Sequence, residues 1–463
     1  MKNIAVIGGG ISGVSIAYFL DRLASAKSKK MSIDIIEKQS EFARDKIGKF
    51  EYKQEIYDSG WHNSITDAGI LYQVMIELGL YRYLIKSKKV YKLIYTKDGI
   101  KSLPERMLYT YPLDKFELMQ SGIFSVKEKL SIFLKLHKNK NLKYINRLTV
   151  EDYFKSTLNS NVYKKIVEPV LTSHYGSDVS KQSIKLLMPE LAEIQNGSDL
   201  ENKIRKLYDD DLKDNIVRSN EYKLRFTLRS FLENLESYFS NRVFIRFDNK
   251  VEKLERREDK YVITIDGRDY FYDYIIVSVK HREFLPWFQD DIRLQRYYKG
   301  LKYVDNLVVI FILNKNSLQV NPEIGEIIFD KEVDTYTTKL EYVSNKWIDI
   351  KSRNIHMLRA YVNRQDKVRD LLKKTDEEII NIIHSELFTI HENLEIEKAL
   401  VTRAERNYIY ADIKYSRYMR ELDRYFKKKY GNIYFIGHSK KAINLEETII
   451  EAREAAKEII EQM

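Results

Sequence analysis

Two periodicities alternate along the first forty residues of the chain. Residues 2–7 form a short apolar, β-branched run, which is typical of a strand buried in a parallel sheet. Residues 14–23 then place apolar side chains at helical spacing, and residues 32–36 form a second apolar run. This order predicts a strand, a helix and a second strand that together start a βαβ unit.

The rest of the chain mixes helical and extended patterns. Helical spacing recurs in the middle, at 126–136, 150–158, 162–172 and 200–207. Apolar strands are predicted at 307–313 and 356–362, and helices at 375–387 and 446–461. The pattern predicts an α/β chain with a largely helical insertion.

A glycine-rich turn joins the first strand to the first helix. Residues 8–13, Gly-Gly-Gly-Ile-Ser-Gly, match G-x-G-x-x-G. Gly8 permits the tight turn, Gly10 lets backbone amides approach a pyrophosphate, and Gly13 lets the helix pack closely on the strand. Glu37 ends the second strand and can accept hydrogen bonds from a ribose. The order of these features predicts a dinucleotide site within residues 1–38. Further apolar segments at 242–251, 262–267, 272–279 and 432–438 favour FAD as the dinucleotide.

Composition narrows the class of protein. The 463 residues suggest two or three domains, and 44% hydrophobic with 32% charged residues fits a folded chain. No apolar run reaches bilayer length, and the glycines come too early for a signal peptide, so we expect a cytoplasmic protein. The absence of cysteine excludes disulfides and thiolate chemistry. We expect neither a metal site nor nucleic-acid binding, because no ligand spacing or recognition motif occurs.

Three further stretches resemble one known family. They are residues 65–85 with Leu78-Gly79-Leu80, residues 93–104 with Lys97-Asp98-Gly99, and residues 149–191 with Val150-Glu151-Asp152-Tyr153-Phe154 and His174-Tyr175-Gly176. Together with the glycine turn, they resemble the FAD-dependent amine-oxidase superfamily, and within it the protoporphyrinogen oxidases.

The resemblance implies a fold and its domains. It implies a Rossmann-like FAD-binding domain assembled from residues 1–90, 222–290 and 405–463. Residues 91–221 would form a mostly helical cap or membrane-facing region, and residues 291–404 a substrate domain with a sheet. A basic stretch at 127–143 is either a solvated helix or a site of peripheral membrane contact.

The resemblance also implies FAD as cofactor and a set of binding residues. These are Gly8, Gly10, Ile11, Ser12, Gly13, Glu37, Lys38, Arg44, Lys46, Gly60, Trp61, Val251, Gly437 and His438. Arg44 and Asp45 stand where the family has two glycines. We expect Arg44 either to pair with the FAD diphosphate or to turn outward and leave the flavin loosely held. Asp58-Ser59-Gly60-Trp61-His62 replaces the family's R-G-P-D-S and is similar to the D-x-G-x-H of other members.

The implied activity is hydride transfer from a flat, apolar acid to flavin N5, with oxygen or a quinone as acceptor. The family substrate would be a porphyrinogen. The flavin carries the chemistry, so His62 is the only catalytic candidate. Two alternatives stay open: another flavin enzyme (an amine oxidase, an isoprenoid desaturase or a mutase-like enzyme), and a flavin-poor relative without catalysis.

Overall fold

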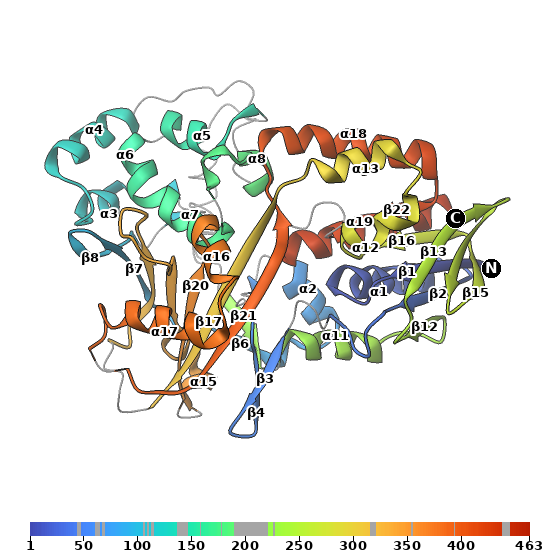
Figure 1. Cartoon of the computed structure of the whole chain (residues 1–463), viewed down its shortest axis with the longest axis horizontal. Helices are drawn as coiled ribbons and strands as arrows, with labels where there is room; N and C mark the ends of the chain where they lie inside the picture. The colour runs from blue at the N-terminus through green and yellow to red at the C-terminus, as the bar shows by residue number, and fades with distance from the viewer. Residues whose placement is uncertain are drawn as a thin grey trace.

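The structure is a computed structural model in which two large sheets lie side by side, each with its own helices (Figure 1). It describes residues 1–463 except 44–47, 61–64, 67–69, 105–106, 109–110, 113–114, 137–146, 158, 177, 189–220, 226, 315–320, 353–354, 393 and 438–444. The predicted helix at 200–207 lies outside the described residues.

The first sheet, here called the parallel sheet, has five parallel strands in the order β12-β2-β1-β16-β22. They are β1 (Lys2–Ile7), β2 (Met31–Ile36), β12 (Val243–Arg246), β16 (Tyr274–Val277) and β22 (Ile433–Phe435). Strands far apart in sequence are thus neighbours, as predicted for a discontinuous Rossmann-like domain. The predicted α/β fold class is confirmed.

Both faces of the parallel sheet are covered, which explains why β1 is apolar without alternation. Ile4 and Val6 pack in one core with α1 (Ile11–Ala26), α2 (Ile70–Glu77), α11 (Leu228–Ser237) and α19 (Leu445–Gln462). Ala5 and Ile7 pack in a second core on the other face. That face is covered by a three-stranded sheet, β13 (Val251–Arg257), β14 (Lys260–Ile265) and β15 (Arg268–Tyr272), and by α12 (His281–Phe284), α13 (Ile292–Lys299) and α18 (Ile413–Tyr430).

The second sheet, here called the large sheet, has seven strands in the order β21-β17-β20-β19-β18-β7-β8. They are β21 (Ile396–Ile409), β17 (Tyr303–Leu313), β20 (His356–Val362), β19 (Lys339–Tyr342), β18 (Ile324–Phe329), β7 (Tyr91–Thr96) and β8 (Gly99–Ser102). Its outer face packs on α16 (Gln365–Leu371) and α17 (Asp376–Leu387). Side chains alternate between the faces, so Arg359 lies on the inner face and its neighbours Leu358 and Ala360 in the outer core.

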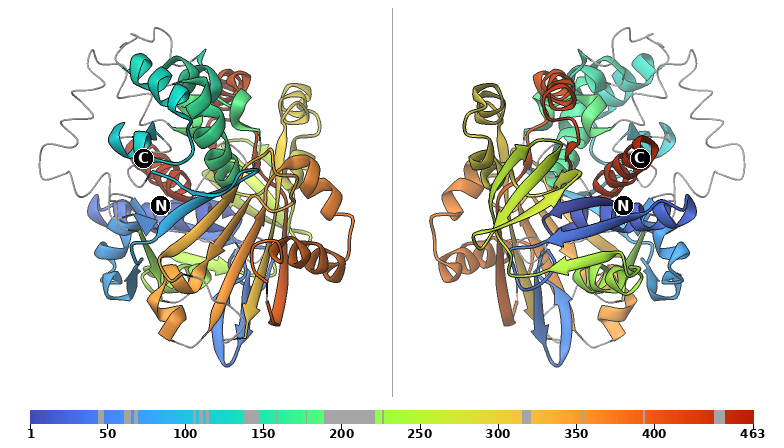
Figure 2. Two further views of the ribbon diagram at one scale, coloured as in Figure 1. Left: turned by 90° about the vertical axis from the view of Figure 1, so that its left-hand side faces the viewer. Right: turned by 90° about the vertical axis from the view of Figure 1, so that its right-hand side faces the viewer.

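The helical cap covers one end of the large sheet (Figure 2). It contains α3 (Lys115–Gln120), α4 (Val126–Leu136), α5 (Val150–Thr157), α6 (Ser160–Val162), a π-helical turn (Tyr163–Val167), α7 (Glu168–Tyr175) and α8 (Ile184–Leu187). The sequence assigned 91–221 to this cap, whereas residues 91–102 form a hairpin in the large sheet. β7 pairs there with β18 in parallel, a contact between segments over 200 residues apart.

Short strands lie where the two sheets meet. β3 (Lys49–Tyr52) and β4 (Glu55–Asp58) form a hairpin, and β5 (Ile65–Thr66), β11 (Glu221–Leu224) and β6 (Leu84–Lys86) form a small sheet. The short helices α14 (Val343–Lys346) and α15 (Ile348–Ser352) follow β19. Among the helices that the structure describes, none is both long enough and apolar enough to span a bilayer.

Candidate functional site

The turn after β1 brings strand and helix into close contact at two glycines. Gly8 has a φ of +109°, which side chains rarely adopt. A Cβ on Gly13 would lie 1.9 Å from the carbonyl oxygen of Gly8, so no larger residue fits without backbone movement. The hydroxyl of Ser278 donates to the same Gly8 oxygen at 3.0 Å and joins β16 to the turn.

The first turn of α1 is arranged to receive an anion. Gly10 is the N-cap, where no side chain caps the helix, and the first turn carries no acidic residue. The N–H groups of this turn therefore have no side-chain acceptor at the cap, and the helix dipole adds positive potential. A Cβ on Gly10 would meet no atom within 4 Å, which leaves room beside the backbone. This arrangement fits a pyrophosphate.

Glu37 lies beside this turn at the end of β2. Its carboxylate accepts hydrogen bonds from the N–H of Gly9 at 2.6 Å and of Gln39 at 2.8 Å. Burial raises the pKa of Glu37, although both N–H groups act in the opposite direction. The N–H of Asn249 donates to the Glu37 carbonyl at 2.9 Å, which brings the approach to Val251 and β13 next to the acid. Each carboxylate oxygen keeps a lone pair that a ribose hydroxyl can use.

Gly437, after β22, closes the site from the C-terminal side. Its φ is +63°, and a Cβ there would lie 2.0 Å from the hydroxyl oxygen of Ser12. Its N–H donates to the carboxylate of Glu451 on α19 at 2.7 Å. The glycine thus lets three distant segments meet at the start of α1.

The other predicted cofactor residues divide into two groups. Lys38 forms an ion pair with Glu283 at 2.9 Å, Gly60 is buried after β4, and Val251 is buried at the start of β13. Arg44, Lys46, Trp61, His62 and His438 lie outside the described residues. The residues that the structure does describe fit the phosphate and ribose end of a dinucleotide.

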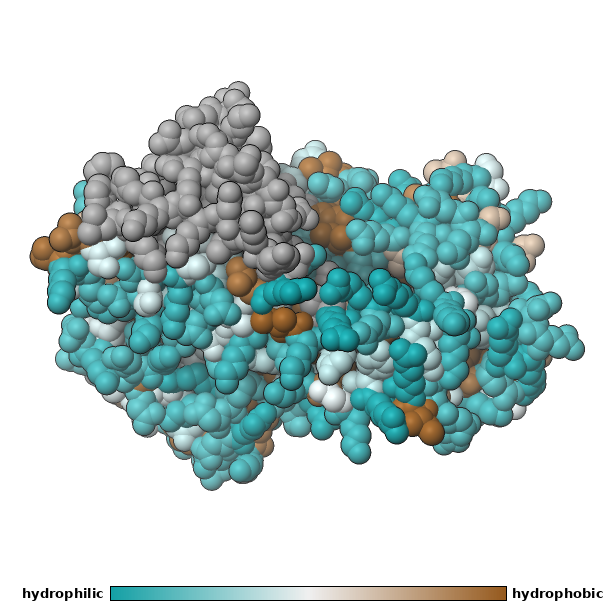
Figure 3. Space-filling view, turned by 90° about the horizontal axis from the view of Figure 1, so that it is seen from above, coloured by the Kyte–Doolittle hydropathy of each residue, from teal (hydrophilic) through white to brown (hydrophobic). Residues whose placement is uncertain are grey.

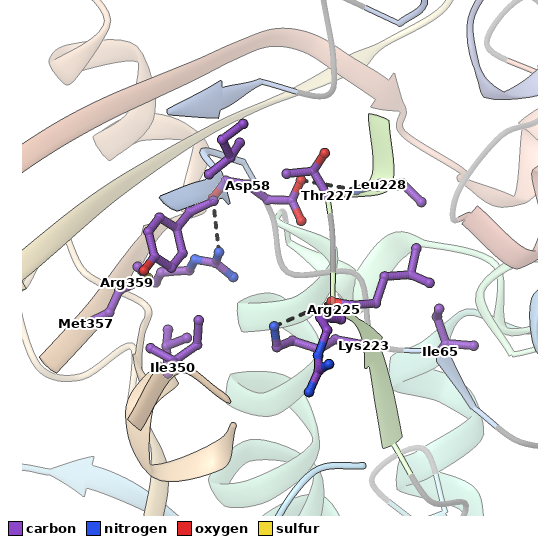
Figure 4. A pocket seen from close by; sticks show the side chains of 13 residues that line it. Asp58, Ile65, Lys223, Arg225, Thr227, Leu228, Ile350, Met357 and Arg359 are labelled. Carbon is purple, nitrogen blue, oxygen red and sulfur yellow. Dashed lines mark hydrogen bonds between the residues drawn. The ribbon is translucent and has the colours of Figure 1, made fainter. Parts of the chain in front are cut away.

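A pocket lies between the two sheets (Figure 4). Its apolar wall comes from the β3–β4 hairpin, β5, β11, α11, β20 and the helices after β19. The apolar residues are Ile56, Tyr57, Ile65, Leu224, Leu228, Val343, Ile350 and Met357. Its polar groups are Asp58, Lys223, Arg225, Thr227 and Arg359. Asp58 precedes the predicted cofactor contact Gly60 by two residues, so the pocket lies next to the predicted flavin site.

Hydrogen bonds and charges fix the polar side of the pocket. Arg359 donates to the carbonyl of Asp58 at 3.1 Å, and the N–H of Leu228 donates to the Asp58 carboxylate at 3.3 Å. Burial raises the pKa of Asp58, although Arg359 and Lys223 act to lower it. Lys223 forms an ion pair with Asp349 at 2.5 Å.

A line of charged side chains, here called the charged row, crosses the inner face of the large sheet to this pocket. Lys92, Glu326, Glu341 and Arg359 are opposite one another on β7, β18, β19 and β20. Lys92 pairs with Glu326 at 3.2 Å, and Tyr361 donates to Glu341 at 2.7 Å. Burial alone would raise the pKa of Glu326, but Lys92 and Lys339 hold it well below its usual range.

His174 lies above the charged row on α7, which packs against β18. Burial, followed by the charge of Lys339, lowers its pKa to about 3. Its own surface is nevertheless exposed to solvent.

The sequence did not single out Lys223, Arg225 or Arg359. The alternation along β20 contains a signal for Arg359, since a charge at an inward position of an apolar strand needs a partner. Nothing in the local pattern marks Arg225. Within the described part of the chain, no three histidine, aspartate or glutamate side chains gather to hold a metal.

Comparison with known proteins supports this geometry. The family model for flavin-containing amine oxidoreductases matches residues 46–460, and that for an NAD(P)-binding Rossmann-like domain matches residues 6–78. Coproporphyrinogen III oxidase of Staphylococcus aureus is 24% identical over 477 residues, covering 100% of both chains.

Two solved structures share the fold. A protein of Exiguobacterium sp. 255-15, provisionally assigned as a protoporphyrinogen oxidase, has a TM-score of 0.84 at 19% identity, covering 100% of this chain and 99% of that one. A reduced UDP-galactopyranose mutase has a TM-score of 0.70 at 11% identity, covering 100% of this chain and 94% of that one. The predicted superfamily membership is confirmed. The chain belongs to the family of flavin-containing amine oxidoreductases, and FAD is its cofactor.

Proposed function

We propose that this oxidoreductase acts on a porphyrinogen, with coproporphyrinogen as the first substrate to test. The pocket between the two sheets carries the proposal. It joins an apolar wall to three cations and lies beside the predicted flavin contacts, which suits a flat, apolar acid. The full-length likeness to a protein named coproporphyrinogen III oxidase supports the same substrate class.

The chain's own residues bind and orient in this proposal. FAD, when bound, accepts the hydride and passes electrons to an acceptor such as oxygen or a quinone. The uncapped start of α1 and Glu37 hold the dinucleotide. The cap and the large sheet enclose the substrate and limit water around it, while lysine and arginine side chains meet its carboxylates.

Porphyrin fluorescence tests this function. The purified protein, reconstituted with FAD, is mixed anaerobically with coproporphyrinogen III or protoporphyrinogen IX and then exposed to air. We expect fluorescence to grow faster than in a sample without enzyme. The Gly10→Val variant controls for autoxidation, because it should lack flavin. Flavin-loaded protein that does not exceed this control would contradict the proposal and favour the amine-oxidase or desaturase alternatives.

We also propose peripheral contact with an anionic membrane surface. On α4, Val126 is 85% and Leu130 60% exposed, with Lys127 and Lys129 beside them. Helices α13 and α18, which contact each other, carry ten basic and two acidic residues. Figure 3 views the side on which these two helices lie and shows a mostly hydrophilic surface with scattered hydrophobic residues. Such a surface would hold a cytoplasmic protein near membranes that supply apolar substrates.

A further inference from the structure

Three cations converge on the pocket from different parts of the chain. Lys223 and Arg225 lie at the end of β11, and Arg359 lies on β20 (Figure 4). Asp58 is the only acid that lines this pocket among the described residues. Because burial raises the pKa of Asp58, its negative charge is less favoured than that of an ordinary aspartate. The pocket therefore has a surplus of positive charge.

The three cations differ in how far the protein already uses them. Arg359 is 4% exposed and holds the Asp58 carbonyl. Lys223 pairs with Asp349. Arg225 is exposed, and its guanidinium makes no hydrogen bond or ion pair with any residue in the described part of the chain. A guanidinium presents paired N–H donors whose spacing matches a carboxylate. Arg225 is thus the cation of the pocket that is available to bind an anion.

The charged row places another cation, Lys92, at the end opposite to Arg359 and the pocket. Lys92 and Arg359 are separated by three strand spacings, from β7 through β18 and β19 to β20. At about 4.8 Å per spacing, their backbones are roughly 14 Å apart. Lys92 is 40% exposed at its side chain despite its ion pair. Cations therefore lie at both ends of the charged row, with the carboxylates of Glu326 and Glu341 between them.

We propose that the pocket binds a carboxylate of the substrate through Arg225, and that this contact selects substrates with carboxylates on opposite sides of the ring. The proposal rests on the proposed function. A substrate with four carboxylates can present one to Arg225 while others reach the opposite edge. A substrate with two adjacent carboxylates can satisfy only one end. Arg225 is in this account a specificity-determining residue.

Substrate series on variants test the proposal. Arg225→Gln removes the charge at an exposed position and should leave folding intact. Arg225→Lys keeps the positive charge but lacks the paired N–H donors of a guanidinium. Arg268→Gln, at an exposed position on β15, is the matched control. For coproporphyrinogen III, with four carboxylates, we expect Arg225→Gln to raise KM about tenfold with kcat within about twofold. The KM for protoporphyrinogen IX, which has two carboxylates, should rise less. Equal effects on both substrates would overturn the selection.

A binding measurement separates this proposal from the proposed function. Coproporphyrin III, the stable oxidised form, is titrated into each FAD-loaded protein and followed by tryptophan quenching. We expect Kd to rise about tenfold in Arg225→Gln, to recover in part in Arg225→Lys, and to stay unchanged in Arg268→Gln. If wild type binds the porphyrin through Arg225 but does not oxidise the porphyrinogen, the proposed function is refuted and the carboxylate site is not.

Two outcomes overturn the carboxylate site. One is an Arg225→Gln variant that binds coproporphyrin like wild type. The other is an Arg225→Gln variant that loses FAD, measured by absorbance near 450 nm, because the pocket would then belong to the cofactor.

Discussion

The main-chain N–H of Gly9 donates a 2.6 Å hydrogen bond to the carboxylate of Glu37. This bond joins the turn after β1 to the end of β2, so the acid is positioned by backbone alone. A Cβ on Gly9 would lie 3.1 Å from the Cβ of Glu37 and 2.9 Å from the ring of Phe42. The middle glycine of the turn therefore has a packing role that the G-x-G-x-x-G pattern does not require.

Gly10→Val should remove FAD without unfolding the protein. The N-cap φ of −77° suits valine, and a Cβ meets no protein atom within 4 Å, so stability of the apoprotein should change by less than about 0.5 kcal/mol. The added side chain would occupy the pyrophosphate's place. Absorbance near 450 nm measures the bound FAD, and thermal unfolding measures the stability of the apoprotein. A Gly10→Val variant that still binds one FAD per chain would show that the pyrophosphate does not bind beside Gly10.

Gly13→Ala should act in the opposite way and destabilise the fold. Alanine in a helix normally stabilises by about 1 kcal/mol relative to glycine. Here the new Cβ would lie 1.9 Å from the Gly8 carbonyl oxygen, and we expect a net loss of about 1–3 kcal/mol in urea unfolding of the apoprotein. Gly122→Ala, whose Cβ meets nothing within 4 Å, is the control. A stabilised Gly13→Ala variant would contradict the packing.

Glu221 should make stability depend on acid pH. Burial alone would raise its pKa, but Lys346 and Lys92 outweigh burial and lower it to about 2 from 4.5. A lowered folded-state pKa stabilises above the unfolded value, and this contribution is lost as the pH falls from 4.5 towards 2. Glu221→Gln should therefore cost about 1–3 kcal/mol at pH 7 and lose less stability on acidification.

Denaturant unfolding at pH 7 and pH 3 measures this difference for Glu221→Gln. Glu332→Gln serves as the control, since the Glu332 side chain is 68% exposed. Parallel pH profiles of wild type and Glu221→Gln would refute the assignment.

The exposed face of α4 should govern membrane contact. The double variant Val126→Asp, Leu130→Asp should weaken sedimentation with vesicles of phosphatidylcholine and phosphatidylglycerol by about tenfold or more, because burial of each aliphatic side chain contributes about 1.5–3 kcal/mol. Thermal unfolding should not change, because the two side chains are 85% and 60% exposed. Wild type that stays in the supernatant would contradict the proposed contact.

Several elements could be predicted because their signals are local. The helix predicted at 126–136 is α4, the strand predicted at 356–362 is β20, and the helix predicted at 375–387 is α17 with Thr375 as its N-cap. The apolar segment at 242–251 is divided between two strands in the structure. β12 ends at Arg246, and β13 begins at Val251 in another sheet. Apolar runs do not show where a chain leaves one sheet for another.

The sequence by itself determined the entry to the nucleotide site. Strand, glycines, helix, strand and Glu37 all lie within forty residues, where backbone sterics and hydrophobic period act over short distances. Only the tertiary structure decided the pairing of β7 with β18 and the meeting of Asp58, Arg225 and Arg359 in one pocket. These residues are more than 130 positions apart, and their contact depends on strand register and sheet docking, which no local pattern specifies.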